Sequence, residues 1–214
     1  MEIPNPLTLI AFVAAFAVAP LAVTMLTSFV KLSVVLMLLR NALGVQMIPP
    51  NMAIYGISMI LTIYIMAPVL MAVKTFIEGS HIDFNNLAAI VGAADEILRP
   101  FHQFLQRHVD PAQLDFFVNS TATLWPKNGP LVASPDSYLI LIPAFVTSEL
   151  TNAFEIGFII YLPFIVIDLI VSNLLLAMGM MMVSPVTISL PFKLFLFVMI
   201  DGWSRLIHGL VQTY

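Results

Sequence analysis

Residues 148–182 read SELTNAFEIGFIIYLPFIVIDLIVSNLLLAMGMMM, and this stretch decides the fold. Its charged side chains are Glu149, Glu155 and Asp168, and the rest is dominated by large apolar residues. A helix needs about 20 predominantly apolar residues to cross a bilayer, so the stretch is long enough to span one. A second apolar stretch follows Ser184-Pro185 and covers residues 186–211. The sequence therefore predicts a hydrophobic helical hairpin with a methionine-rich turn.

The first part of the chain has the same character. Residues 3–30 and 41–73 carry no charge, and Lys31 and Arg40 lie between them. Gly44 and the pair Pro49-Pro50 break helix geometry, which predicts a tight turn. We therefore expect one helix over residues 7–39, a second over residues 51–77, and a first hydrophobic hairpin formed by the two.

An acidic segment, residues 78–136, separates the two hairpins. Its acids are Glu78, Asp83, Asp95, Glu96, Asp110, Asp115 and Asp136, and its bases are Arg99, Arg107 and Lys127. The segment holds the whole net charge of −4, which favours a water-exposed domain. Helical spacing over residues 87–105, and a cap followed by a first-turn proline at Asp110-Pro111, predict two short helices. Breaker residues at 125–130 predict a loop.

The composition fits a membrane protein better than a soluble one. Of the residues, 60% are hydrophobic and 9% are charged, whereas soluble domains carry about 25% charged residues. The predicted fold is all-α and membrane-associated: a first hairpin over residues 1–77, a small helical acidic extracytoplasmic domain over 78–136, and a second hairpin over 137–214. Each hydrophobic segment contains a proline that is expected to kink or interrupt its helix, at Pro20, Pro68, Pro163 and Pro191. Irregular backbone at membrane depth favours a channel-like assembly.

The loop charges predict an orientation. Short cytoplasmic loops are enriched in Lys and Arg, so Lys31 and Arg40 place the turn at residues 44–50 on the cytoplasmic side. The acidic domain and both termini are then expected on the periplasmic side. No positively charged region precedes the first apolar stretch, so a cleavable signal peptide is not expected.

Several classes of function are disfavoured by what the sequence lacks. It has no cysteine for a nucleophile, a disulfide or a cysteine metal site, and no basic run for nucleic acid. It has no Walker loop, nucleophile elbow or HExxH sequence, and its histidines show no metal-ligand spacing. We therefore expect no enzyme, no cofactor, no metal and no nucleic-acid partner.

The charges inside the apolar segments are the first candidate functional residues. Glu149, Glu155, Asp168 and Lys193 have no oppositely charged neighbour at helical spacing, so pairing between helices or between subunits is expected. An alternative is a proton- or solute-coupled transporter that uses Asp168 and Glu155. Asp201 and Arg205 stand four residues apart and predict a local ion pair.

The methionine-rich turn is the second candidate. Met178, Met180, Met181 and Met182 surround Gly179. These residues could be ordinary apolar filler. Flexible thioether side chains can also close around objects of varied shape, and a ring of such turns in an oligomer would form a deformable seal.

Motifs in the second hairpin resemble a known family. Residues 143–158 read PAFVTSELTNAFEIGF, residues 163–169 read PFIVIDL, residues 190–194 read LPFKL, and residues 201–203 read DGW. Together they resemble the signatures of the SctR/FliP family of inner-membrane export-gate proteins in type III secretion systems. The order of hairpin, acidic domain and hairpin agrees with that family over the whole chain.

The resemblance implies a function that composition does not show. It implies a structural and gating subunit that forms a ring of five copies in the bacterial inner membrane, as the entry pore for unfolded secreted polypeptides. Its implied partners are two smaller membrane subunits of the SctS and SctT types and the switch protein of the SctU type.

The resemblance also implies roles for individual residues. Met178, Gly179, Met180, Met181 and Met182 would form the pore gasket, and Glu149 and Lys193 would bridge neighbouring subunits. The apolar hairpins would lie largely above the bilayer plane. The expected absence of a signal peptide favours the injectisome branch, which serves virulence, over the flagellar branch.

Overall fold

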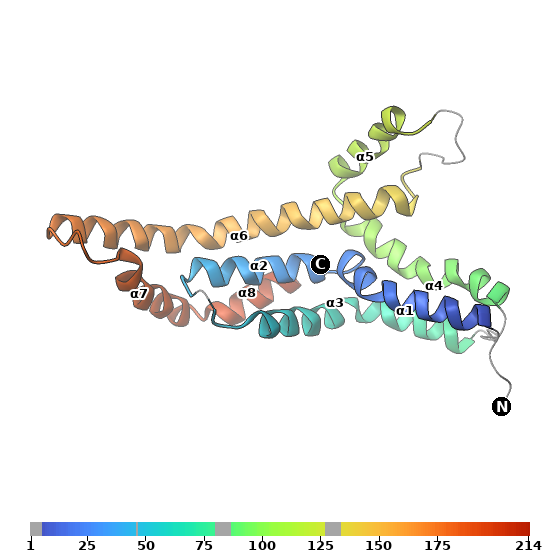
Figure 1. Cartoon of the computed structure of the whole chain (residues 1–214), viewed down its shortest axis with the longest axis horizontal. Helices are drawn as coiled ribbons and strands as arrows, with labels where there is room; N and C mark the ends of the chain where they lie inside the picture. Colours follow the sequence, from blue (N-terminus) through green and yellow to red (C-terminus); the bar gives the residue numbers. More distant parts are fainter. Residues whose placement is uncertain (1–5, 46, 80–86, 127–133) are drawn as a thin grey trace. The chain divides into compact units, whose positions relative to one another are not determined.

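The computed structural model describes residues 6–45, 47–79, 87–126 and 134–214, and the secondary structure of these residues is helical (Figure 1). The helices are α1 (Pro6–Met25), α2 (Phe29–Ala42), α3 (Asn51–Gly79), α4 (Leu87–His108), α5 (Pro111–Leu124), α6 (Tyr138–Ala177), α7 (Pro185–Met199) and α8 (Gly202–Val211). No strand occurs in these ranges, so the prediction of an all-α fold is confirmed.

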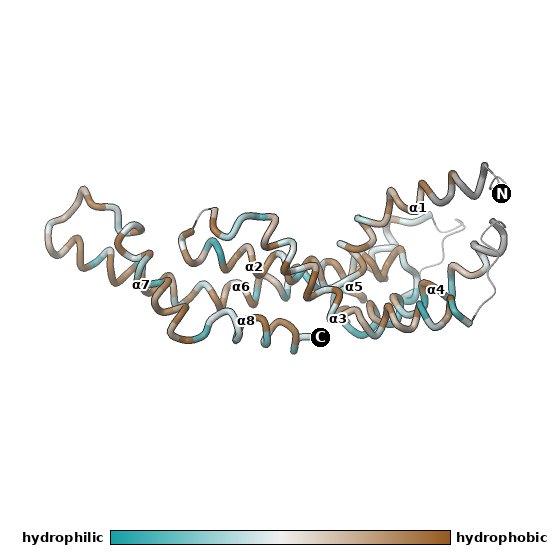
Figure 2. Tube along the Cα trace, turned by 90° about the horizontal axis from the view of Figure 1, so that it is seen from below, coloured by the Kyte–Doolittle hydropathy of each residue, from teal (hydrophilic) through white to brown (hydrophobic). Residues whose placement is uncertain are grey.

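Two helices are long and apolar enough to cross a membrane, namely α3 and α6. The pairs α1–α2 and α7–α8 are each interrupted by a short break, and each pair could serve as one further span. The described chain therefore has two to four candidate membrane spans. Figure 2 shows hydrophobic residues along much of α6 and α7.

The first hairpin was predicted correctly in one helix and wrongly in the other. The helix expected over residues 51–77 is confirmed as α3. The single helix expected over residues 7–39 is wrong, because α1 ends at Met25 and α2 begins at Phe29. At this break the hydroxyl of Thr27 donates to the carbonyl of Val23 and accepts from the N–H of Phe29. Such side-chain bonds compete with the backbone ladder of a helix.

The second hairpin bends at an unexpected place, whereas its first helix begins close to residue 137, where the hairpin is expected to begin. Helix α6 begins at Tyr138, ten residues before the predicted stretch. The predicted return helix is two helices, α7 and α8, bent by 62° at Ile200 and Asp201. Asp201 has a left-handed backbone with φ 53°, a conformation that aspartate adopts more readily than most residues.

The four prolines do not mark the helix breaks. Pro20, Pro68, Pro163 and Pro191 lie inside α1, α3, α6 and α7. The expectation was that each proline would kink or interrupt its helix. Interruption is wrong, because the helices continue through all four prolines, and kinking stays a prediction. Loss of one backbone hydrogen bond leaves enough neighbouring bonds to continue these long apolar helices.

The two helices predicted in the acidic segment are present as α4 and α5. Asp110 caps α5, because its carboxylate accepts from the N–H of Ala112 at 2.7 Å and Pro111 follows in the first turn. This predicted cap is confirmed. Most of the loop expected at residues 125–130 lies outside the described residues, since the description stops at Pro126.

The chain forms two compact units. One contains Met1–Val30 and Thr62–Glu149, and the other contains Lys31–Leu61 and Leu150–Tyr214. In the first unit the start of α6 is tied to α4: the Gln106 amide donates to the Asp136 carboxylate at 2.7 Å, and the Tyr138 hydroxyl donates to the Leu98 carbonyl at 3.2 Å. Phe104 of α4 packs against Phe145 of α6, with ring centroids 5.9 Å apart.

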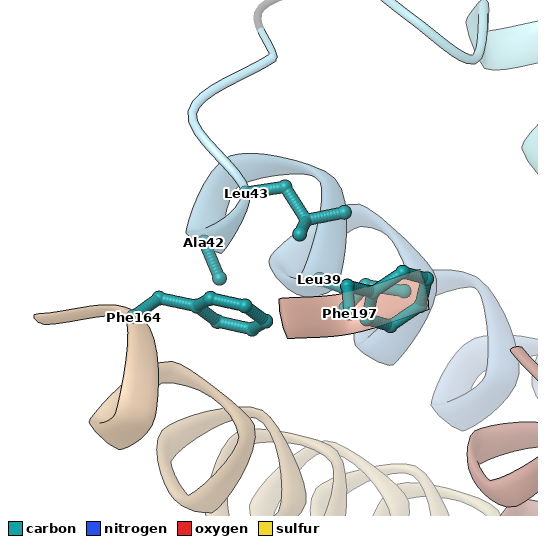
Figure 3. Close-up of a cluster of buried hydrophobic side chains, with 5 residues drawn as sticks. All are labelled: Leu39, Ala42, Leu43, Phe164 and Phe197. Carbon is teal, nitrogen blue, oxygen red and sulfur yellow. The ribbon is translucent and has the colours of Figure 1, made fainter. Parts of the chain in front are cut away.

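The core of the second unit joins α2, α6 and α7. Figure 3 shows Phe164 of α6 and Phe197 of α7 beside Leu39 and Ala42 of α2 and the following Leu43. All five side chains are buried. This core fixes the base of the α6–α7 hairpin, whose turn carries the methionines.

Candidate functional site

The methionine turn has a defined backbone geometry. Two backbone hydrogen bonds end α6. The N–H of Met180 donates to the Leu175 carbonyl at 2.9 Å, and the N–H of Gly179 donates to the Leu176 carbonyl at 3.0 Å. Gly179 has φ 73°, which side chains with a Cβ rarely adopt. This pattern is the Schellman motif, and it explains why a glycine stands among the methionines. Pro185 then begins α7.

The methionine side chains of the turn are exposed. Met178 is 63% exposed, Met180 44%, Met181 83% and Met182 101%. Met178 also lines an apolar cavity of about 360 Å³ between α6 and α7. The tip of the hairpin therefore presents flexible thioether side chains, with little packing inside its own chain.

A polar cluster closes the base of the same hairpin. The Lys193 ammonium of α7 donates to the Asp168 carboxylate of α6 at 2.6 Å. The other carboxylate oxygen of Asp168 accepts from the Ser189 hydroxyl at 2.5 Å. Only 5% of the Lys193 side chain is exposed, against 37% for Asp168. Two of the four residues expected to pair between helices or subunits thus meet between two helices of one chain.

Lys193 also reaches the end of a third helix. Its ammonium donates to the carbonyl of Ala42, the last residue of α2, at 3.2 Å. The last carbonyls of a helix lack intrahelical partners and carry the negative end of the helix dipole, so a cation stabilises them. Gly44 follows with φ 78°, and a Cβ at that position would lie 3.9 Å from the ammonium. Lys193 therefore joins α2, α6 and α7.

The turn between α2 and α3 is held by Arg40. Its guanidinium donates to the Asn51 side-chain oxygen at 2.6 Å and to the Pro49 carbonyl at 3.3 Å. The bond between Ile48 and Pro49 is cis. Lys31, the other charge used to predict the orientation, is buried in α2 with its ammonium 3.6 Å from the centre of the Tyr214 ring. Both cations therefore have structural partners.

The remaining predicted residues lie apart from this cluster. Glu149 is 1% exposed, and Glu155 is exposed on α6. Asp201 lies just before α8, and Arg205 lies within that helix. Backbone groups of the two residues are in contact: the Arg205 N–H donates to the Asp201 carbonyl at 3.1 Å. The side-chain ion pair of Asp201 and Arg205 stays a prediction.

Three residues of this unit were missed by the sequence analysis. Ser189 stands four residues before Lys193, which puts both on one face of α7, and this spacing could have revealed it. Gly157 and Gly202 allow close packing. A Cβ on Gly157 would lie 2.3 Å from a Leu38 methyl carbon, and one on Gly202 would lie 2.3 Å from the Phe197 ring.

Histidine, aspartate and glutamate do not gather in the described part of the chain into a group of three that could hold a metal ion. The arrangement instead offers an apolar, flexible tip and a base fixed by one buried cation.

Comparisons with known proteins place the chain in a family. The family model described as "FliP family" matches residues 12–210. The chain is 54% identical to "Yop proteins translocation protein R" of Yersinia pestis, over 100% of this chain and 99% of the relative. It is 46% identical to "Virulence protein YscR" of Salmonella typhimurium over the full length of both. It is 45% identical to "Hypersensitivity response secretion protein HrcR" of Ralstonia nicotianae, over 97% and 96% of the two chains. The chain belongs to the FliP family.

Proposed function

We propose that this protein is a structural and gating subunit of a type III secretion export apparatus, of the injectisome branch, and that it forms the oligomeric entry pore for unfolded protein substrates. The support is the family and the names of full-length relatives, which refer to translocation, virulence and secretion. The alternative of a proton- or solute-coupled transporter gains no support from those names.

The observation that carries the gating role is the exposure of the methionine turn. Met181 and Met182 lie at the hairpin tip, where Met181 is 83% exposed and Met182 is fully exposed. Methionine adapts its shape because it is unbranched and has three rotatable side-chain bonds. A ring of five such tips would close on itself when empty and widen around an extended polypeptide.

The exposed apolar surface supports an assembly with other subunits. On α6 alone, Phe158, Ile159 and Val166 are 63%, 66% and 53% exposed. Large exposed apolar surfaces mark protein or membrane contacts. We propose that neighbouring copies, subunits of the SctS and SctT types and the switch protein of the SctU type cover part of this surface in the inner membrane.

The orientation and the bridging charges belong to the same proposal. The turn between α2 and α3 would face the cytoplasm, and residues 78–136 with both termini would face the periplasm. Glu149 would bridge neighbouring subunits, as would Lys193 in addition to its contacts within the chain. The subunit would need no catalysis of its own, so the energy for export would come from other components.

Ion conductance of the purified complex in planar lipid bilayers tests the gasket. Replacing Met178, Met180, Met181 and Met182 by alanine shortens the side chains that close the ring, so the complex is expected to conduct ions constitutively. The matched control replaces four exposed methionines outside the turn, Met47, Met52, Met59 and Met71, which are 81%, 86%, 40% and 67% exposed. This control should stay closed. An unchanged conductance in the turn variant would contradict the gasket.

Native mass spectrometry of the purified protein, alone and with its partner subunits, tests the assembly. A pentamer supports the pore. A monomer that transports protons or solutes without partner subunits would overturn the proposal.

A further inference from the structure

The second unit contains a cavity with a single charged lining residue. It has a volume of about 390 Å³ and lies between α6 and α8, with contributions from α2 and α7. Ile156, Ile160 and Phe164 line it from α6, and Arg205, Gly209 and Leu210 line it from α8. Arg205 is exposed, and the ion pairs and side-chain hydrogen bonds of the described residues do not include it. The cavity therefore offers apolar walls and one unpaired cation.

The opposite face of α6 carries a complementary feature. Phe154 and Phe158 are 58% and 63% exposed, and the exposed Glu155 lies beside them, about 100° around the helix from Phe154 and about 60° from Phe158. Successive residues of an α-helix are about 100° apart, so Phe158 lies about 160° from the cavity-lining Ile156 and Ile160, and Phe154 lies about 160° and about 120° from them. We call Phe154, Glu155 and Phe158 the α6 knob. It combines apolar bulk with one anion that the rest of the described chain does not pair.

We propose that the α6 knob of one copy fills the α6–α8 cavity of the next copy, with Glu155 of the first copy pairing with Arg205 of the second. This inference rests on the proposed oligomeric pore and names one contact that builds it. The cavity and the knob lie on opposite faces of one helix. A contact between two different surfaces of the same chain generates a ring when the rotation closes.

Charge complementarity favours a second copy over a lipid as the occupant. A phospholipid could place an acyl chain in the cavity and its phosphate on Arg205. Glu155 would then remain exposed among phenylalanines in an apolar segment, where an unpaired charge is costly. A neighbouring copy pairs both charges and covers both apolar surfaces at once.

A disulfide experiment tests the contact directly, because the chain has no cysteine of its own. The variant carrying both Phe158→Cys and Gly209→Cys is expected to form a ladder of disulfide-linked copies when the membrane complex is oxidised. The bond forms when two Cβ atoms approach within about 4.5 Å. The matched control pairs Phe158→Cys with Gly56→Cys. Gly56 also has open space around its Cβ position, but it is not among the residues that line the cavity. This control should give no ladder.

Charge reversal and cavity filling provide a second readout, the fraction of oligomer in native mass spectra. Glu155→Arg alone and Arg205→Glu alone should each lower the oligomer fraction about tenfold, and the two together should restore it. A Cβ added at Gly209 or at Gly56 meets no atom within 4 Å. Gly209→Leu places a side chain at the cavity and should also prevent assembly, whereas Gly56→Leu should not.

The outcomes separate this inference from the proposed function. The inference is overturned if the oligomer is intact but shows no disulfide ladder and no rescue by the double charge reversal. The proposal of an oligomeric pore would still stand. Phospholipid that stays bound to the oligomer, and is lost in Arg205→Glu, assigns the cavity to lipid and also overturns it. If the unaltered protein forms no oligomer even with its partner subunits, the pore proposal fails as well.

Discussion

Four charged residues of the second unit fall into two groups with opposite surroundings. Lys193 is buried and is bound by Asp168 and by the end of α2. Glu155 and Arg205 are exposed in similarly apolar segments, and the described residues give their side chains no ion pair. Sequence alone does not separate these groups, because every one of these charges interrupts an apolar helix.

The difference shows what each group contributes. A buried ion pair is weak evidence for added stability, but removing one partner is strongly destabilising because it leaves a buried charge uncompensated. An exposed charge costs little to remove from the isolated chain. The outer group is therefore expected to control assembly alone, whereas the inner group is expected to control folding in addition to the bridging contact proposed for Lys193. Three substitutions test this division and a fourth tests the packing of α8, and their effects are read as the free energy of unfolding of the purified protein in detergent.

Asp168→Asn is expected to have the largest effect, a loss of about 3–5 kcal/mol, because it leaves the Lys193 ammonium buried without a counterion. The side chain of Lys193 is 5% exposed, so water cannot replace the lost carboxylate. The control is Glu78→Gln, which breaks the exposed Lys74–Glu78 pair of 3.6 Å. That change should cost no more than about 0.5 kcal/mol. Equal losses in the two variants would remove the distinction between inner and outer charges.

Lys193→Met is expected to cost less, about 2 kcal/mol. Methionine has a similar length and fills the space, and Asp168 keeps both the Ser189 hydroxyl and an exposed fraction of 37%. The loss comes from the Ala42 carbonyl, which is left without its donor. Measuring the free energy of unfolding of Lys193→Met and Asp168→Asn under the same conditions checks which variant loses more stability. A larger loss in the lysine variant would mean that the carboxylate, and not the ammonium, is the poorly hydrated partner.

Gly202→Ala is expected to cost about 1–2 kcal/mol, since its Cβ would lie 2.3 Å from the buried Phe197 ring. Gly209→Ala in the same helix is the matched control, because its Cβ enters open space. Alanine favours a helix over glycine by up to about 1 kcal/mol, so the control should be neutral or more stable. If both variants lose stability equally, close packing of α8 against Phe197 is not what requires the glycine.

The sequence predicted those parts of the fold that depend on the local backbone preferences of single residues. The α2–α3 turn and the start of α5 were predicted because proline and aspartate have local backbone preferences that need no tertiary context. The breaks at Thr27 and Asp201 were missed, although the run of Thr24, Thr27 and Ser28 and the dipeptide Asp201-Gly202 carry a local signal. The helix interruptions were predicted at the prolines instead, but long apolar helices tolerate proline.

The candidate site was predictable as a set of residues but not as a geometry. The methionines and the charged residues stand out in an apolar sequence. Their partners depend on how α6 turns back into α7, which brings Lys193 to Asp168 across 25 residues and to Ala42 across 151. No periodicity within one helix contains that information. The same holds for Gly202, whose neighbour Phe197 is brought close by the bend before α8.

Glu155→Gln is expected to have the smallest effect on unfolding, less than about 0.5 kcal/mol, because the exposed carboxylate has no partner among the described residues. In native mass spectra the same variant should lose oligomer about fivefold, since about 1 kcal/mol of pairing with Arg205 of the next copy is removed. The control is Asp115→Asn, an exposed acid of α5 that should change neither measurement. A stability loss in Glu155→Gln as large as in Asp168→Asn would place Glu155 in the inner group. Unchanged unfolding together with an unchanged oligomer would show that an exposed charge in these helices can be silent, and the division between folding and assembly would then hold for Asp168 and Lys193 alone.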